Sequence, residues 1–190
     1  MKTTFFSRIG SLAFRCAASG ICLLCLASVS DGQRRDYLID EEIEIVRENQ
    51  DIDVRIDVLV KMIDRRFTAI GSDTGGWKIK DKESPVWGTL PELSRADTLW
   101  DIRQIMTKAM EDIDTIAERD SDALMQNRTS GKLFPKAVKS LEKAAKRYLP
   151  KLRELSAAIT DDRERGPVET LIEMCEDIIQ AASTIPEPKK

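Results

Sequence analysis

Histidine is absent from the sequence, and its absence excludes several classes of active site. Histidine is the usual base of serine and cysteine hydrolases, a common zinc ligand, and part of the di-iron sites of helical bundles. Phosphate-binding motifs are missing as well, because the glycines at 71–76 are not followed by the Lys-Ser/Thr of a P-loop. We therefore expect no catalytic residue of these kinds, no metal site and no cofactor.

Cysteine is scarce outside the first thirty residues, which hold three of the four cysteines. These thirty residues are typical of a secretory signal peptide: three basic residues precede an uncharged, largely apolar stretch at 16–29 that ends in small residues. That stretch is shorter than the roughly 20 residues that a helix needs to cross a bilayer. We predict that residues 1–30 are a cleaved leader, that the protein is exported to the periplasm or beyond the cell, and that the mature chain has no transmembrane span.

The mature chain would keep only Cys175. A single cysteine cannot close a disulfide within the chain, so the fold must be stabilised by burial. Cys175 falls on an apolar stripe, and we expect it to be buried and unreactive. The alternative, a disulfide bridge to a second copy, would require Cys175 to be exposed.

Glycine, proline and aromatic residues are also sparse, whereas charged residues make up 33% of the chain. This composition favours helix over sheet. The glycines of the mature chain fall between runs of regularly spaced apolar residues, where helices are expected to end. We predict one all-α domain over residues 31–183, followed by a disordered tail at 184–190.

The apolar spacing predicts four amphipathic helices that share one core, as in a four-helix bundle. Two long helices span about 36–70 and 92–125. A third begins near Leu133 and is kinked or split by Pro150, and a shorter fourth opens at Gly166. Two capping boxes precede the second helix, so the sequence does not determine which residue begins it. The topology of the bundle is also left undetermined.

The first predicted helix carries the clearest apolar pattern. Four residues repeat every seven positions: Leu38, Ile45, Ile52 and Leu59. Residues 52–58 also alternate as a strand would, but the seven-residue pattern continues through them without a glycine or proline, so helix is preferred. An acidic run lies near the start of this helix, where it complements the helix dipole and is expected to be solvated: Asp40, Glu41, Glu42 and Glu44.

A loop of about twenty residues, 71–91, carries Trp77 and Trp87. Loops of this length inside a compact domain are often functional. The two tryptophans would either line a ligand pocket or close one end of the core. We favour closure of the core, because a tryptophan side chain stabilises a fold mainly through the large apolar area that it buries.

Basic residues concentrate in the third predicted helix, where residues 132–153 carry a net charge of +7 against −13 for the rest of the mature chain. Four lysines recur every three or four positions and form what we call the basic ridge: Lys136, Lys139, Lys143 and Lys146. The ridge would either contact an anionic ligand or be a solvated face. A solvated face is favoured, and nucleic acid is not expected, because aromatic residues for base stacking are lacking.

Residues 35–50, RDYLIDEEIEIVRENQ, resemble the opening of exported all-α bacterial proteins that have no assigned function. The likeness extends to residues 116–120 and 148–152. It implies export and an all-α fold, and it implies no particular chemistry.

Residues 56–67, followed by Lys78, are similar to the first helix and the downstream lysine of helical chorismate mutases, which act through arginine and lysine electrostatics. The Asp-x-x-Arg-Glu of that family is replaced here by DKESP at 81–85. Two hypotheses follow. The first is a non-enzymatic interaction or structural module with a protein partner or a second copy. The alternative is a protein with a small-molecule pocket near Trp77 or Trp87. The most specific version of this alternative is a chorismate-mutase-like enzyme.

The leader prediction is tested by replacing Leu23, Leu24 and Leu26 with aspartate. The substitutions remove the apolar stretch that the export machinery reads, so the full-length precursor should accumulate in the cytoplasm. Cell fractionation and intact mass measure the outcome. Normal export and trimming of the variant would show that residues 1–30 are not a signal peptide.

Overall fold

The computed structural model of the protein describes residues 35–78, 84–119 and 129–185. Every regular element in these ranges is helical, which confirms the all-α prediction for them: α2 (Asp40–Glu48), α3 (Ile52–Ala69), the 3-10 turn η1 (Pro85–Trp87), α5 (Arg95–Arg119), α7 (Thr129–Ala157) and α8 (Asp162–Ala182). They belong to one compact unit that begins at Tyr37. The predicted leader lies outside the described residues. No helix in the described ranges is both long and apolar enough to cross a membrane.

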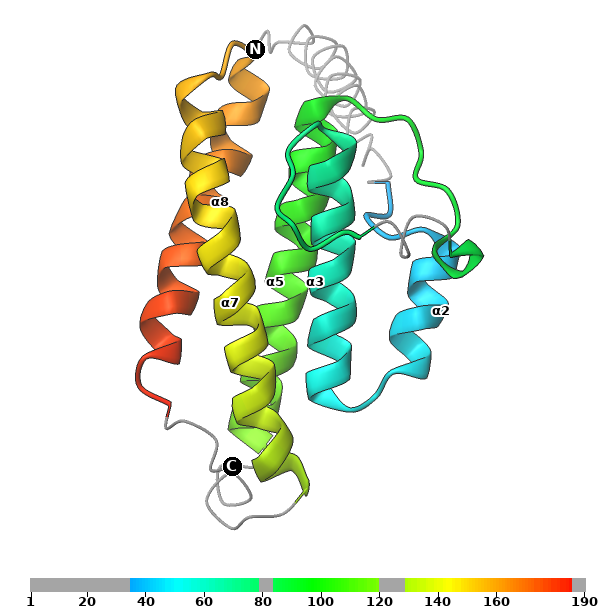
Figure 1. The fold of residues 1–190 in the computed structure, drawn as a ribbon, viewed down its shortest axis with the longest axis vertical. Helices are drawn as coiled ribbons and strands as arrows, with labels where there is room; N and C mark the ends of the chain where they lie inside the picture. Colours follow the sequence, from blue (N-terminus) through cyan, green and yellow to red (C-terminus); the bar gives the residue numbers. More distant parts are fainter. Residues whose placement is uncertain (1–34, 79–83, 120–128, 186–190) are drawn as a thin grey trace, which may run out of the picture. The chain divides into compact units, whose positions relative to one another are not determined.

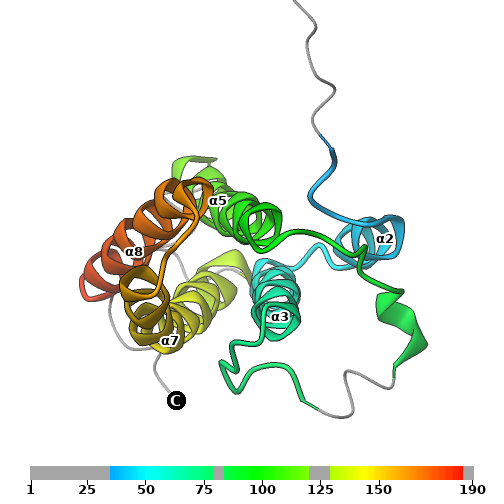
Figure 2. The same cartoon turned by 90° about the horizontal axis from the view of Figure 1, so that it is seen from above.

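Helices α3, α5, α8 and α7 lie side by side in a ring, and α2 packs outside it against α3 and η1 (Figures 1 and 2). Contacts between side chains fix the directions. Arg55 of α3 pairs with Asp112 of α5, and Arg66 of α3 pairs with Asp101 of α5. The residue numbers of the partners run in opposite directions, so α3 and α5 are antiparallel. Helix α3 is parallel to α7, since Asp64 pairs with Arg147 and Asp57 with Ser140.

The core is built from the apolar stripes that the spacing predicts. Buried residues recur along each helix at intervals of three and four: Ile56, Leu59 and Ile63 in α3; Leu99, Ile102 and Met106 in α5; Leu141, Ala144 and Tyr148 in α7; Val168, Leu171 and Cys175 in α8. The prediction that Cys175 is buried is confirmed, and burial raises the pKa of its thiol to about 12. A thiol in this state is not a nucleophile at neutral pH.

The predicted single helix over 36–70 is wrong, because the chain breaks at 49–51 and α2 folds back beside α3 (Figure 1). An ion pair explains the break. Glu42 and Arg66 lie 24 residues apart in the chain and yet meet at 2.8 Å. On a straight helix, a rise of about 1.5 Å per residue would separate them by about 36 Å. The preference for helix over strand at 52–58 is confirmed, since these residues form the start of α3.

Two other helix starts differ from the predicted ones. Helix α5 begins at Arg95, directly after Ser94 of the second predicted capping box, whose Oγ accepts the Asp97 amide at 3.1 Å. Helix α8 begins at Asp162 rather than at Gly166, because the Asp161 carboxylate accepts the Arg163 amide at 3.0 Å. Pro167 therefore lies in the second turn of α8, where its missing N–H removes one helical hydrogen bond.

The third helix is longer than predicted at its start, and α7 runs from Thr129 to Ala157 without being split at Pro150. Residues 184 and 185 of the predicted tail lie within the described part of the chain. Ile185 donates its amide to the Ala182 carbonyl at 3.3 Å and packs on a small second cluster that contains Phe134 and Val138. Residues 186–190 lie outside the described part of the chain.

The core assignment of α7 is tested by Leu141→Ala. Leu141 is buried in the main cluster, so its truncation should lower the free energy of unfolding by about 2–5 kcal/mol. The matched control is Lys143→Ala, two residues away and exposed, which should change stability by about 0.5 kcal/mol or less. Urea unfolding of both variants decides; equal effects would show that this face of α7 is not core.

Candidate functional site

Charged side chains gather inside the protein around the C-terminal half of α3. Three carboxylates face three guanidinium groups: Glu42, Asp64 and Asp101 against Arg65, Arg66 and Arg147. All are buried except Arg147, which is half-buried. We call these six residues the interior charge network. Its charges balance, so no net charge is carried into the interior.

Glu42 is the centre of the network and has no solvent exposure. Its Oε1 accepts hydrogen bonds from Arg65 at 3.1 Å and from Arg66 at 2.9 Å, and its Oε2 accepts a second bond from Arg66 at 2.8 Å. The prediction that the whole acidic run is solvated is therefore wrong for Glu42, although Asp40, Glu41 and Glu44 are exposed. Asp40 and Glu41 lie in the first turn of α2, where the helix dipole favours them, and Glu44 pairs with Arg47, whereas Glu42 faces α3.

Arg65 and Arg66 extend the network to the backbone of neighbouring segments. Arg65 donates to the carbonyls of Trp87 at 2.7 Å and Gly88 at 2.8 Å. Arg66 donates to the Tyr37 carbonyl at 2.6 Å, and its Nε lies 3.6 Å from the Asp101 carboxylate. Burial lowers the pKa of Arg65, an effect that the Glu42 carboxylate opposes. The two arginines thus hold both the N-terminal segment and the α3–α5 loop against α3.

Asp64 binds the other end of that loop. Its Oδ1 accepts the Thr74 hydroxyl at 2.6 Å, and its Oδ2 accepts Arg147 of α7 at 2.9 Å. The backbone of Gly76 lies so close that a Cβ there would fall 1.7 Å from Oδ2. Next to this group, Tyr148 donates its hydroxyl to the Val60 carbonyl at 3.2 Å, and burial raises the pKa of that phenol well above its usual value.

The two tryptophans of the loop contact one another. The rings of Trp77 and Trp87 meet edge to face with centroids 5.3 Å apart, and Trp87 is buried in the main core. Arg65 lies 5.7 Å from the ring centre of Trp77, and Lys61 lies 5.9 Å from that of Trp87. These are cation–π distances, so the basic groups cover the rings.

Two carboxylates of the interior charge network are hydrogen-bonded at both oxygens. Glu42 accepts from Arg65 and Arg66, and Asp64 accepts from the Thr74 hydroxyl and Arg147. In the ranges that the structure describes, no group of three or more cysteine or acidic residues is placed to hold a metal ion. The arrangement links α3 to α2, to α5, to α7 and to the described parts of the α3–α5 loop.

The basic ridge is only partly a free surface. Lys136 and Lys143 are exposed, as predicted. Lys146 and Lys139 both pair with Glu142, at 2.7 and 3.1 Å, and the hydrogen bond from Lys146 lowers the pKa of that carboxyl. We expected Lys139 to be exposed; it is partly buried instead, and it donates to the Ala182 carbonyl at the end of α8. That bond satisfies a helix-terminal acceptor.

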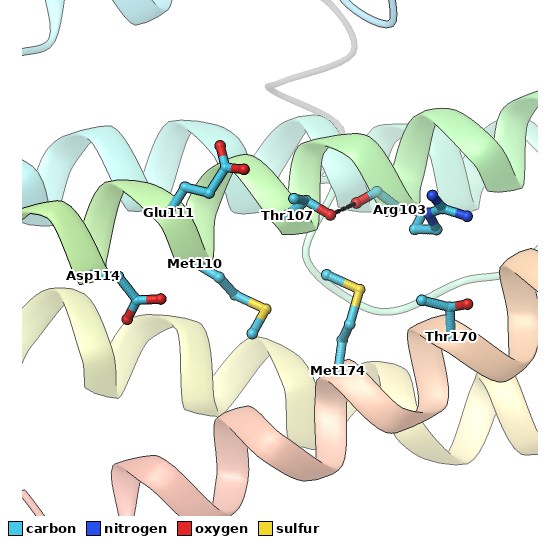
Figure 3. Close-up of a pocket in the computed structure, with 7 residues that line it drawn as sticks. All are labelled: Arg103, Thr107, Met110, Glu111, Asp114, Thr170 and Met174. Atoms are coloured by element: carbon cyan, nitrogen blue, oxygen red, sulfur yellow. Dashed lines mark hydrogen bonds between the residues drawn. The ribbon is translucent and has the colours of Figure 1, made fainter.

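A second candidate site is an open groove between α5 and α8, with a volume of about 470 Å³ (Figure 3). Met110 and Met174 point into it from the two helices, and Thr107 and Thr170 donate their hydroxyls to carbonyls of their own helices. Arg103, Glu111 and Asp114 complete the lining. The sequence did not predict this groove, because a single sequence does not reveal which face of α5 meets α8.

No protein-family model, curated protein or solved structure matches the chain. The described part of the chain offers two candidate functional features, the interior charge network and the groove between α5 and α8.

The packing of the loop against Asp64 is tested by Gly76→Ala. The added methyl group would collide with the Asp64 carboxylate, so the free energy of unfolding should fall by about 1–3 kcal/mol. Gly166→Ala is the matched control: apart from its chain neighbours and its own helix, nothing lies within 4 Å of a Cβ placed at Gly166, and alanine there should change stability by about 0.5 kcal/mol or less. Urea unfolding that ranks the two variants in the opposite order would contradict the assigned position of the loop.

Proposed function

We propose that this protein is an exported, non-enzymatic interaction module, a four-helix bundle of α3, α5, α7 and α8 released by cleavage of a leader at residues 1–30. In this proposal it acts in the cell envelope or outside the cell, by contact with a protein partner. The observation that carries the proposal is the use of the interior arginines. Arg65, Arg66 and Arg147 donate to carboxylates and backbone carbonyls of the same chain.

The pocket alternative would need basic groups that converge on a cavity beside the tryptophans. Arg65 instead bonds with Glu42, Trp87 and Gly88, and Trp87 is itself buried. A mutase-like site also needs positive charge that is left for an anionic substrate, whereas Arg65 and Arg66 both bind Glu42. This arrangement gives the enzymatic alternative no support.

The groove between α5 and α8 is the surface we assign to the partner. Methionine side chains adapt their shape to different apolar groups, and a groove of this kind accepts one face of an amphipathic helix. The lining holds two acidic residues, Glu111 and Asp114, and one basic residue, Arg103. Glu173 and Asp177, which are close to Met174 in the sequence, are also exposed on α8. The occupant is therefore a helical segment whose apolar stripe is flanked by lysine or arginine.

The proposal is tested by carrying out affinity capture from the envelope and medium of the producing cell with a tagged protein. A variant with Met110→Glu and Met174→Glu should lose the captured partner, because it places charge on the apolar floor of the groove. Lys143→Glu, on the exposed face of α7, is the matched control and should keep it. A partner retained equally by all three proteins would place the contact elsewhere, and turnover of chorismate would revive the enzymatic alternative.

A further inference from the structure

Helix α2 is joined to the rest of the protein by a small contact that centres on one ion-pair cluster. Its buried residues are Glu42 and Ile45. Both oxygens of Glu42 are bound by Arg66, and one of them also by Arg65. The surface of α3 on which α2 packs therefore binds a negative charge, through the guanidinium groups of Arg65 and Arg66.

The linker that folds α2 back carries no residue that requires a turn. Residues 49–51 read Asn-Gln-Asp, without glycine or proline. Asn49 and Asp51 have φ values of −103° and −67°, which any residue adopts. The local support for the break consists of hydrogen bonds from the Asn49 and Gln50 side chains to carbonyls of α2, the first of them 2.7 Å long. Nothing in this linker prevents a helical conformation.

The apolar pattern continues across the linker in the register of a single helix. Ile45, Ile52 and Leu59 are seven residues apart, and all three belong to the core cluster. If residues 49–51 became helical, α2 and α3 would form one helix of 30 residues, Asp40–Ala69, with one continuous apolar stripe. The sequence thus supports both a folded-back and a straight form.

In the straight form, Arg65 and Arg66 would lose the Glu42 carboxylate of their own chain. That form would move Glu42 about 36 Å along the helix from Arg66, since 24 residues separate them. Buried guanidinium groups that lose their carboxylate are strongly unfavourable. The missing carboxylate would have to come from another molecule that presents the same surface, and a second copy of α2 provides that surface.

We propose that α2 is exchanged between two copies of this chain. In the exchanged dimer, residues 49–51 of each copy are helical, and Glu42 of each copy accepts the hydrogen bonds of Arg65 and Arg66 in the other. Every contact of α2 is kept, and only the linker changes conformation, as in other exchanges of an identical element between protomers. Because α2 must leave its contact with α3 before it can be exchanged, the dimer forms during refolding at high protein concentration and persists after dilution.

The test measures dimer content by size exclusion with light scattering after refolding at high concentration and dilution. Wild-type protein should contain a minor dimer that persists. Replacing Asn49, Gln50 and Asp51 together with alanine removes the side-chain bonds that support the break and favours helix, so the dimer fraction should rise about ten-fold. A dimer fraction unchanged by the triple replacement would overturn the proposal.

Two control variants separate exchange from other forms of association. Gln50→Pro disfavours a continuous helix at the linker and should abolish the dimer while leaving the monomer folded. Gln50→Gly should lower the dimer fraction in the same direction, and it serves if the proline variant does not fold. A dimer that survives both substitutions would be held by another surface, and exchange of α2 would then be wrong.

Discussion

The structure depends on the ion pair between Glu42 and the adjacent arginines Arg65 and Arg66. A carboxylate with no solvent exposure is unfavourable unless its oxygens are bound by donors, and here three guanidinium hydrogen bonds bind them. Meeting this requirement turns the chain at 49–51 and brings the Trp87 and Gly88 carbonyls to Arg65. The positions of α2 and of Trp87 and Gly88 both follow from this pairing.

The fold class and the core were within reach of the sequence, because burial imposes a spacing of three and four on apolar residues. Leu59, Leu99, Tyr148 and Cys175 are buried where that spacing predicts. The break at 49–51 was not predictable from apolar spacing, since Ile45 and Ile52 keep the same register on both sides of it. One signal was present: the positions four after Leu38 and Ile45 are Glu42 and Asn49, where the continuing pattern has isoleucines.

The candidate sites were less predictable than the core, because they depend on which helix faces meet. Trp77 and Trp87 were identified from the sequence, whereas their contact with one another and the place of Trp87 in the core were not. Long-range charge pairing is invisible in local spacing: Asp64 meets Arg147 over 83 residues. Lys139 was assigned to a solvated ridge by the same local reasoning, and it contacts the end of α8 instead. The charged groups of the interior charge network bind other groups of the same chain. They are therefore not left to bind a ligand, which is why we propose an interaction module.

A double-mutant cycle on Glu42 and Arg66 tests the central role of this pair most directly. Urea unfolding of Glu42→Gln, Arg66→Met and the double variant measures their coupling free energy. Our account predicts a coupling of about 2–3 kcal/mol, because each single variant leaves the other partner's charge buried without compensation. A coupling of about 0.5 kcal/mol or less would contradict it, and would mean that apolar packing alone places α2 against α3.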